Sequence, residues 1–336
     1  MREVDYIIVG AGSAGCVLAN RLSADPDVSV LLLEAGGRDW NPLIHIPLGT
    51  GKLVRSSMHS WGYWTEPEPH LDNRKLYWPR GKVLGGSSSI NSMIYVRGHP
   101  RDYDTWAQLG NRGWAWDDVL PYFKRSEGHV DRRGDDLHGT AGPLKVQRGR
   151  GDNPLYDAFV AAGVQAGMTR IDDCTGPEQE GVCRYDFTIH DGRRASAAVC
   201  YLRPAMTRSN LTVETSALTH RVVLEGGRAT GVEYARGGAG GGSLERVHAR
   251  REVILAGGSL NSPQLLMLSG IGPGDHLQRH GIAPLVDLPG VGRNLQDHLD
   301  IPLQYACPEP VTLHSLVRLD RAALAMAQAA LFRTGP

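Results

Sequence analysis

Residues 6–15 read YIIVGAGSAG, and this stretch decides the fold. Its first four residues are a short apolar run of the kind that forms a buried β-strand, and residues 17–22 (VLANRL) have the apolar spacing of a helix. Between them, Gly10 permits a tight turn, Gly12 lets the backbone approach a pyrophosphate, and Gly15 lets the helix pack on the strand. We therefore predict a strand, turn and helix that bind a dinucleotide at the helix N-terminus.

A second apolar run, residues 28–33, ends at Glu34, about 20 residues beyond the glycine pattern, as in dinucleotide-binding βαβ units. Glu34 is expected to accept hydrogen bonds from the adenosine ribose hydroxyls. The alternative is that Glu34 is a solvated strand end and that the glycines merely shape a turn. The pattern does not separate NAD from FAD, but the sequence shows no second complete GxGxxG. A single dinucleotide is therefore expected, and if it is FAD, its electrons come from an organic substrate.

The rest of the chain alternates short β-type runs with glycine-rich breaks. Residues 253–256 predict a buried strand, after which a helix is expected to start at Ser262, with Pro263 in its first turn. The charged, glycine-rich segment 128–151 is interpreted as an exposed linker, with a soft domain boundary near its end. Further strands are predicted at residues 211–213, 221–224 and 231–235, a glycine-rich tip at 237–242, and a helix at 316–332.

Composition and charge exclude several classes of protein. The 336 residues include 36 Lys+Arg and 36 Asp+Glu, so the chain has no net charge to attract nucleic acid. No apolar run reaches the roughly 18 residues of a membrane-spanning helix, and the glycine pattern begins too early for a cleavable signal. We expect a cytoplasmic location, with peripheral attachment to the inner membrane left open.

Cysteine and histidine spacing gives no sign of a metal site. The sequence contains the five cysteines Cys16, Cys174, Cys183, Cys200 and Cys307. They include no CxxC pair and are odd in number, which argues against a disulfide framework and a structural zinc site and favours a reducing compartment. His276 and His280 are spaced like ligands on a helix but have no third partner, so we expect a solvated pair and assign no metal.

A second stretch of small residues runs from Gly81 to Gly98 and contains GGSSS at residues 85–89. Its backbone N–H and hydroxyl groups are suited to line the phosphates or ring edge of a ligand. Serine–glycine stretches are more often flexible linkers, but this one is flanked by aromatic and β-branched residues. Its serines also lack the GxSxG context of a hydrolase nucleophile.

Residues 10–34, 81–104 and 258–272 together resemble the glucose-methanol-choline oxidoreductases. The two interior stretches are similar to the two signature patterns of that family along their whole length. The resemblance is closest to the branch of choline dehydrogenases and alcohol dehydrogenases. Shorter family-like stretches at residues 60–63, 113–114, 120–123 and 291–298 extend it over nearly the whole chain.

The resemblance implies an α/β fold, in which a doubly wound, Rossmann-like FAD-binding domain is interleaved with an α+β substrate domain that is incomplete in this chain. The FAD-binding domain is expected at residues 1–152 and 192–302, and the substrate domain at residues 153–191 and 303–336. The break near residue 150 is visible in the sequence itself, whereas the interleaving comes from the resemblance.

FAD is the sole cofactor that the resemblance implies, with its adenine against Val222. Because Ile90 stands where some relatives carry a histidine bonded covalently to the flavin, dissociable FAD is expected. The other implied contacts are Gly10, Gly12, Ser13, Ala14, Gly15, Glu34 and Ala35, together with Val83, Gly86, Ser87, Asn91, Ser92, Met93 and Ile94 at the flavin end.

The activity that the resemblance implies is oxidation of an alcohol CH–OH group by hydride transfer to flavin N5. In relatives, a histidine paired with a second histidine or an asparagine takes the hydroxyl proton. That pair lies in a C-terminal segment beyond the end of this chain, so we assign no catalytic residue, and His298 is expected to have a structural role near the flavin.

Two functions therefore follow from the sequence. The first is an FAD-dependent alcohol dehydrogenase or oxidase of choline type, and the alternative is a non-catalytic FAD-binding fragment that needs a separately encoded C-terminal segment. A short-chain NAD dehydrogenase is disfavoured because the expected Tyr-x-x-x-Lys pair is missing. The alcohol substrate stays open, and so does the electron acceptor, whether oxygen, a quinone or a protein carrier.

Overall fold

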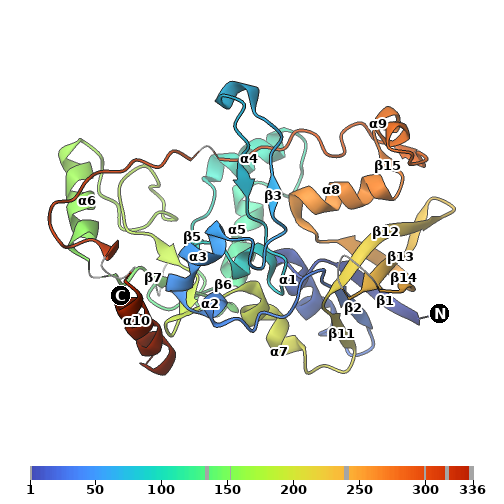
Figure 1. Cartoon of the computed structure of the whole chain (residues 1–336), viewed down its shortest axis with the longest axis horizontal. Helices are drawn as coiled ribbons and strands as arrows, with labels where there is room; N and C mark the ends of the chain where they lie inside the picture. Colours follow the sequence, from blue (N-terminus) through green and yellow to red (C-terminus); the bar gives the residue numbers. More distant parts are fainter. Residues whose placement is uncertain are drawn as a thin grey trace. The chain divides into compact units, whose positions relative to one another are not determined.

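The chain forms two compact units in the computed structural model, which describes residues 2–132, 136–151, 153–237, 242–298, 300–314 and 318–332. The first unit comprises residues 1–44, 51–90 and 196–301. The second comprises residues 45–50, 91–195 and 302–336. Each unit has its own sheet (Figure 1).

A six-stranded sheet organises the first unit, with the strand order β11-β2-β1-β14-β13-β12 (Figure 1). The first four strands in this order run parallel, and β13 and β12 extend the sheet as an antiparallel hairpin. Buried apolar residues from β1 and β2 form one cluster with Leu265 of the covering helix α8. The strands are β1 (Arg2–Val9), β2 (Val30–Leu33), β11 (Leu211–Glu214), β12 (Ala217–Glu225), β13 (Arg228–Arg236) and β14 (Leu244–Leu255).

The predicted βαβ unit is confirmed. Helix α1 (Ser13–Leu22) follows β1 directly and leads to β2, and β1 pairs with β2 in parallel register from Tyr6↔Val30 to Val9↔Leu33. The predicted strands after residue 210 are also present, whereas residues 238–241 of the glycine-rich tip lie outside the described residues.

Helix α8 (Gly258–Leu268) begins four residues earlier than the sequence predicts, so Pro263 lies inside it rather than in its first turn. The connection from β14 is short, only Ala256 and Gly257: Gly257 is the N-cap and Gly258, the first residue of the helix, has φ +84°. Because a positive φ favours glycine, Gly258 suits this tight entry into α8.

The second unit contains a four-stranded sheet with the order β5-β8-β7-β6. Its strands are β5 (Ile94–Tyr95), β6 (Glu127–His129), β7 (Leu144–Arg148) and β8 (Asp186–Phe187), and the hairpin β9 (Ile189–His190) and β10 (Arg193–Arg194) follows. Its longer helices are α4 (Pro100–Gln108), α5 (Trp116–Ser126), α6 (Pro154–Gln165) and α10 (Leu319–Phe332); residues 316–317 of the predicted last helix lie outside the described residues.

The prediction of an exposed linker at residues 128–151 is wrong for the described part of that segment. It supplies β7 and part of β6, and both His129 and Val146 are fully buried. Its charged groups form local contacts at the surface: the Asp131 carboxylate accepts a 2.8 Å hydrogen bond from the Arg148 backbone N–H and forms an ion pair with Arg150, whose side chain is 64% exposed. Residues 133–135 lie outside the described residues.

Short elements complete the chain. They are α2 (Pro42–His45), α3 (Thr50–Arg55), α7 (Arg203–Ala205), α9 (Gly274–Arg279), the strand pairs β3 (Tyr63–Trp64) with β4 (Tyr77–Trp78) and β15 (Ile271–Gly272) with β16 (Val286–Asp287), the 3-10 turns Pro47–Gly49, Pro69–Leu71 and Gly86–Ser89, and a π-helical turn Ala198–Leu202. Within the described ranges, no helix is both long enough and apolar enough to cross a membrane.

The predicted domain limits and the observed units can be compared residue by residue, although the units do not test which part binds the cofactor. The prediction returns to the FAD-binding domain at 192 and leaves it at 302, and the units change at 196 and 301. Residues 91–151, predicted to belong to the FAD-binding domain, instead lie in the second unit, and residue 152 lies outside the described residues. The assignment of one part to cofactor and another to substrate stays a prediction.

The sequence argued against a disulfide framework and gave no pairing, but the structure contains a disulfide between Cys174 and Cys183. A β-bridge between Arg170 and Val182 brings the two segments together, which the sequence spacing could not reveal. Cys16 is a buried thiol and Cys307 an exposed one, so the odd total is compatible with a single bond.

Candidate functional site

The carboxyl ends of three neighbouring strands, β2, β1 and β14, open onto a cavity of about 880 Å³ in the first unit. In open α/β sheets, ligands bind outside these ends of the strands, and cofactor pockets commonly have 300–1,000 Å³. The glycine turn, the residues after β2, the Gly86 loop, one side of β12 and helix α8 line it. The predicted residues among the lining are Gly10, Gly12, Ser13, Ala14, Glu34, Ala35, Gly86 and Ser87.

The glycine turn is held tightly against the sheet. The Gly10 N–H donates a 2.8 Å hydrogen bond to the Leu33 carbonyl. A Cβ at Gly15 would lie 1.9 Å from the Gly10 carbonyl oxygen, so α1 can approach the turn only with glycine there. Gly12 is the N-cap of α1 and no side chain caps this end of the helix, so its N–H groups and partial positive charge can serve an anion.

Glu34 is almost fully buried at the end of β2, with 5% of its surface exposed. Its Oε2 accepts a 2.8 Å hydrogen bond from the Ala11 N–H, and its Oε1 accepts another of 2.8 Å from the Gly36 N–H. Burial raises the pKa of Glu34 to about 7, against the effect of these donors and the charge of Lys82. Glu34 is therefore fixed to the glycine turn, and it is one of the residues that line the cavity.

The Gly86 loop packs directly on the glycine turn. The Gly85 N–H donates a 2.7 Å hydrogen bond to the Ala11 carbonyl, and a Cβ at Gly86 would lie 2.7 Å from the Gly12 Cα. Val83 and Ile90, at either side of this loop, are buried in an apolar cluster with Ile44 and Leu53. Of the predicted flavin contacts in this unit, Gly86 and Ser87 line the cavity, whereas the Val83 side chain packs in the core.

Val222 does not itself line the cavity, although Thr219 and His220 of the same strand do. Its backbone N–H donates a 2.8 Å hydrogen bond to the buried hydroxyl of Ser269, which donates to the Leu265 carbonyl at 2.6 Å. This pair of bonds ties β12 to α8 beneath the cavity wall.

Sequence reasoning offered Trp61 and Tyr63 as a possible cover over the flavin, with core packing as the alternative, but missed the contact between Tyr63 and Asn261 in the cavity wall. The Tyr63 hydroxyl donates a 2.6 Å hydrogen bond to Asn261 Oδ1, and the Tyr63 ring stacks on Trp61 at 5.9 Å. Burial raises the pKa of the Tyr63 hydroxyl. The signal was present, because Trp61 and Tyr63 belong to one family-like stretch and Asn261 to another, but nothing in the sequence places the two stretches together.

The remaining predicted flavin contacts, residues 91–94, lie in the second unit. Asn91 is held by the buried Arg194, whose Nη1 donates to the Asn91 carbonyl at 2.7 Å and to its Oδ1 at 2.8 Å. Met93 is buried, has φ +63°, and accepts hydrogen bonds from the N–H and hydroxyl of Thr188 at 2.8 and 3.2 Å. Asn91, Ser92 and Ile94 are exposed.

The candidate histidines do not form a catalytic cluster in the described residues. His276 and His280 lie edge to face with ring centroids 4.7 Å apart at α9, and His298 is exposed.

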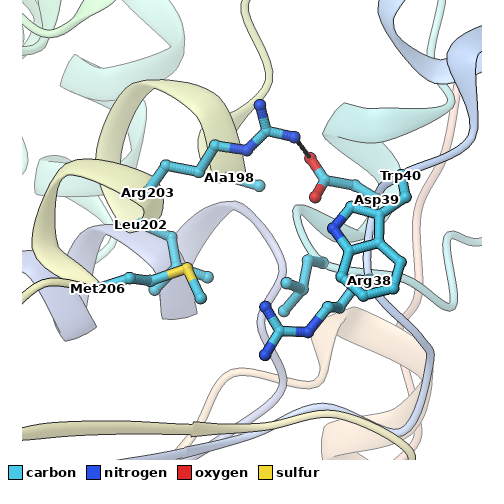
Figure 2. Close-up of a pocket in the computed structure, with 8 residues that line it drawn as sticks. Arg38, Asp39, Trp40, Ala198, Leu202, Arg203 and Met206 are labelled. Atoms are coloured by element: carbon cyan, nitrogen blue, oxygen red, sulfur yellow. Dashed lines mark hydrogen bonds and ion pairs between the residues drawn. The ribbon is translucent and has the colours of Figure 1, made fainter.

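A smaller cavity of about 360 Å³ also lies in the first unit, with an apolar floor of Leu84, Ala198, Leu202 and Met206. Figure 2 shows its polar side, where the Arg203 guanidinium points at Asp39. This ion pair has a distance of 2.8 Å, and Arg38 stands over the Trp40 ring at 5.4 Å. Because Asp39 is buried and already paired, its interaction with Arg203 has a structural role.

Residues 4–300 match the family described as GMC oxidoreductase. The chain belongs to this family. It is 50% identical over 333 residues to an oxygen-dependent choline dehydrogenase of Brucella anthropi, a match that covers 99% of this chain and 60% of that protein. It thus spans about 60% of the length of such a relative.

Two solved structures are also similar to this chain. An FAD-dependent oxidoreductase from Chaetomium thermophilum has a TM-score of 0.89 and 32% identity over 99% of this chain and 59% of that one. A pyridoxine 4-oxidase from Mesorbium loti has a TM-score of 0.82 and 41% identity over 88% of this chain and 57% of that one. These likenesses confirm the α/β, Rossmann-like fold, and together with the family they support FAD as the dinucleotide.

Proposed function

We propose that this chain is the FAD-binding part of an oxidoreductase that oxidises alcohols, and that it holds FAD non-covalently. The observation that carries the proposal is the cavity at the strand ends, where Glu34 and the uncapped N-terminus of α1 meet. In dinucleotide-binding folds, a carboxylate after the second strand binds the ribose and the helix N-terminus binds the pyrophosphate.

Each part of the proposed FAD site, which comprises the start of α1, Glu34, the Gly86 loop, and Tyr63 with Asn261, has a defined role. The N–H groups at the start of α1 bind the pyrophosphate, and Glu34 accepts hydrogen bonds from the ribose hydroxyls. The Gly86 loop and Ser87 line the path toward the flavin, and the wall of Tyr63 and Asn261 excludes water from it. Covalent attachment through Ile90 is ruled out by chemistry, since its side chain has no nucleophilic atom and is 2% exposed in the core.

FAD supplies a hydride acceptor at N5 when it is bound, which makes an alcohol CH–OH group the proposed donor. Choline is the first candidate because the named relative at 50% identity is a choline dehydrogenase. We assign no catalytic base within the described residues, and the resemblance places that base in the C-terminal part of family members. Oxygen is the first electron acceptor to test, beside a quinone and a protein carrier.

The test is the visible spectrum of the chain after incubation with FAD and removal of unbound flavin, followed by anaerobic addition of choline and other alcohols. Retained flavin supports the cofactor proposal, and its bleaching by an alcohol supports oxidation by this chain. Retained flavin that stays oxidised favours the FAD-binding fragment that requires a C-terminal segment. A chain that retains no flavin refutes the proposal.

A further inference from the structure

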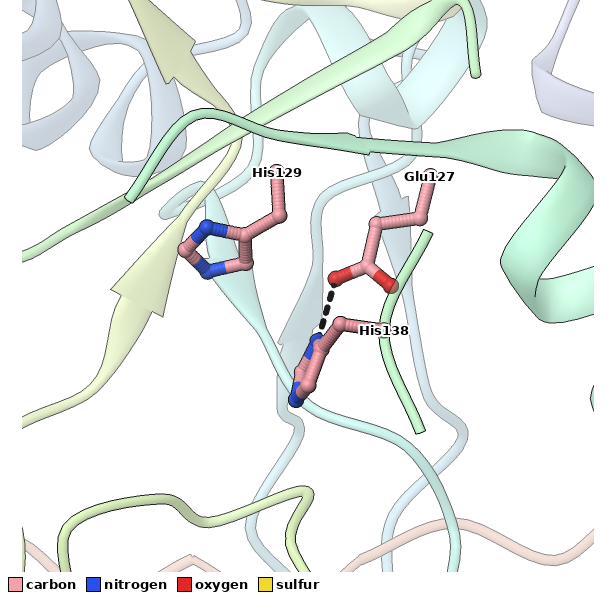
Figure 3. A group of neighbouring side chains, drawn as sticks. All are labelled: Glu127, His129 and His138. Carbon is pink, nitrogen blue, oxygen red and sulfur yellow. Dashed lines mark hydrogen bonds and ion pairs between the residues drawn. The ribbon is translucent and has the colours of Figure 1, made fainter. Parts of the chain in front are cut away.

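A buried cluster of charges lies in the second unit at Glu127, His129 and His138, whose ligand-type atoms are all within 4.8 Å of one another (Figure 3). Both ring nitrogens of His138 already contact carboxylates, Nδ1 at 2.8 Å from Glu127 and Nε2 at 2.7 Å from Asp173. Glu127 also pairs with Arg97. Although burial lowers the pKa of His138, these two carboxylates raise it to about 9, so His138 holds a proton at each ring nitrogen, facing a carboxylate on either side.

The disulfide lies at the edge of this cluster. Asp173, which contacts His138, immediately precedes Cys174. The other oxygen of the Asp173 carboxylate accepts hydrogen bonds from the Thr175 N–H and hydroxyl at 2.8 and 2.9 Å. Both cysteines are partly exposed, whereas Thr175 is buried. The disulfide therefore joins two partly exposed residues, next to residues that are packed into the charge cluster.

From the cluster, a continuous set of contacts leads to residues 91–94. His129 Nδ1 accepts two backbone N–H bonds at 3.2 Å, so Nε2 carries the proton and contacts Asp186 at 3.1 Å. Asp186 lies in β8, which pairs with β5 at Tyr95↔Asp186 and Ile94↔Phe187. Thr188, just beyond β8, holds the Met93 carbonyl.

We propose that Cys174–Cys183 is a thiol–disulfide exchange site for a dithiol reductant, and that its reduction loosens residues 91–95 through Asp173, the charge cluster and β8. The bond closes a loop with a sequence separation of 9, and it adds a covalent constraint next to Asp173, which His138 and Thr175 also hold. In the reaction the S–S bond breaks, two thiols form on the chain, and the reductant gives up two electrons and two protons as it closes its own disulfide.

The proposed coupling between the disulfide and residues 91–95 originates in the difference between the oxidised and the reduced state of the bond. With the disulfide formed, the Val182 N–H donates to the Thr169 carbonyl at 2.8 Å and the Ile171 N–H to the Val182 carbonyl at 3.1 Å. When it is reduced, only non-covalent contacts hold the loop, among them these two bonds and the contacts of Arg132 with Asp172 and Asp173, and the Asp173 carboxylate can leave His138. The importance of residues 91–95 for catalysis rests on the proposed function, but their loosening does not.

Hydrogen–deuterium exchange of the full chain, before and after dithiothreitol, tests the proposal without any flavin present. We expect exchange to rise at least about tenfold in peptides covering residues 173–188 and residues 91–95, because their hydrogen bonds open locally. Peptides covering β1, in the first unit, should not change. Reoxidation should restore the slow rates.

Controls separate the pair from the other thiols. The double variant Cys174→Ser/Cys183→Ser should exchange like the reduced chain with or without dithiothreitol, and Cys307→Ser, at an exposed thiol, should respond like the wild type. If the double variant does not fold, the reduced and oxidised wild type still provide the comparison. If exchange rates do not change on reduction, the proposal is overturned. If exchange accelerates in residues 173–188 but not in residues 91–95, the coupling between them is overturned. If reoxidation does not restore the slow exchange, the disulfide is not a reversible switch. A chain that binds no FAD but shows the reversible response would refute the proposed function alone.

Discussion

Replacing Glu34 with glutamine perturbs the proposed ribose site with minimal change in volume. In the wild type each carboxylate oxygen accepts one backbone N–H, from Ala11 and from Gly36, both at 2.8 Å. In Glu34→Gln the charge is gone and one of the two oxygens becomes an NH₂ group. One backbone donor then loses its acceptor, and the ribose hydroxyls lose a charged partner.

The expected loss can be worked out from these bonds. A hydrogen bond to a charged group contributes about 1.5–3 kcal/mol, and each 1.4 kcal/mol is a factor of about ten in affinity, so FAD should bind about 10–100 times more weakly. Titration with FAD, followed by flavin fluorescence, measures this. FMN lacks the adenosine half, so its affinity should not change. Glu225→Gln, at an exposed ion pair on β12, is the matched control.

The pH dependence gives an independent check. Burial raises the pKa of Glu34 to about 7, and hydroxyl donors favour the charged carboxylate, so FAD binding should release a proton. Below pH 7 the wild-type Kd should therefore rise, by up to about tenfold per pH unit, because the carboxyl must first lose its proton. Glu34→Gln should lack this dependence. Equal FAD affinity of wild type and variant, with parallel pH profiles, would refute our account of Glu34.

Other predictions concern stability, measured by chemical unfolding of the chain. Gly15→Ala should cost about 3 kcal/mol or prevent folding, since its Cβ would meet a carbonyl oxygen at 1.9 Å, whereas Gly37→Ala, in open space, should be close to neutral. Because the pKa of His138 is raised to about 9, the stability that its protonated form contributes should be complete below pH 6.5 and lost as the pH rises to 9. His138→Asn should remove this pH dependence of the free energy of unfolding. A wild type that is equally stable at pH 6.5 and pH 9 would contradict the prediction. Arg194→Lys should lose about 1–3 kcal/mol, because one ammonium nitrogen cannot reproduce the guanidinium fork in which Nη1 donates to Asn91 and Nη2 donates to the Thr50 hydroxyl at 2.7 Å; an unchanged midpoint would count against that role.

Sequence alone predicted the parts of the fold that local patterns encode. Apolar spacing and glycine positions predict the strand, glycine turn and helix at residues 2–22 and the second strand that ends before Glu34. These elements are close together in the sequence, and their glycine pattern is that of a known dinucleotide-binding motif. The same holds for the hairpin of β12 and β13, whose two strands flank the glycines at 226 and 227.

The second unit was harder to predict because its core is polar. Residues 128–151 have the composition of a linker, yet His138 is fixed by Asp173 and His129 by Asp186, far along the chain. Neither charge pattern nor spacing reveals such long-range partners. The disulfide was missed for the same reason, as was the bond between Tyr63 and Asn261, which are 198 residues apart.

The central claim is that the cavity at the ends of β1, β2 and β14 binds FAD, and flavin retention by the wild type beside Gly12→Val tests it most directly. A Cβ at Gly12 has no neighbour closer than 3.9 Å, so the variant should fold normally while its side chain fills the cradle. The account predicts that the wild type retains flavin after desalting, and that the variant, with an unchanged unfolding midpoint, does not. Equal retention by both chains, or none by the wild type, would contradict it.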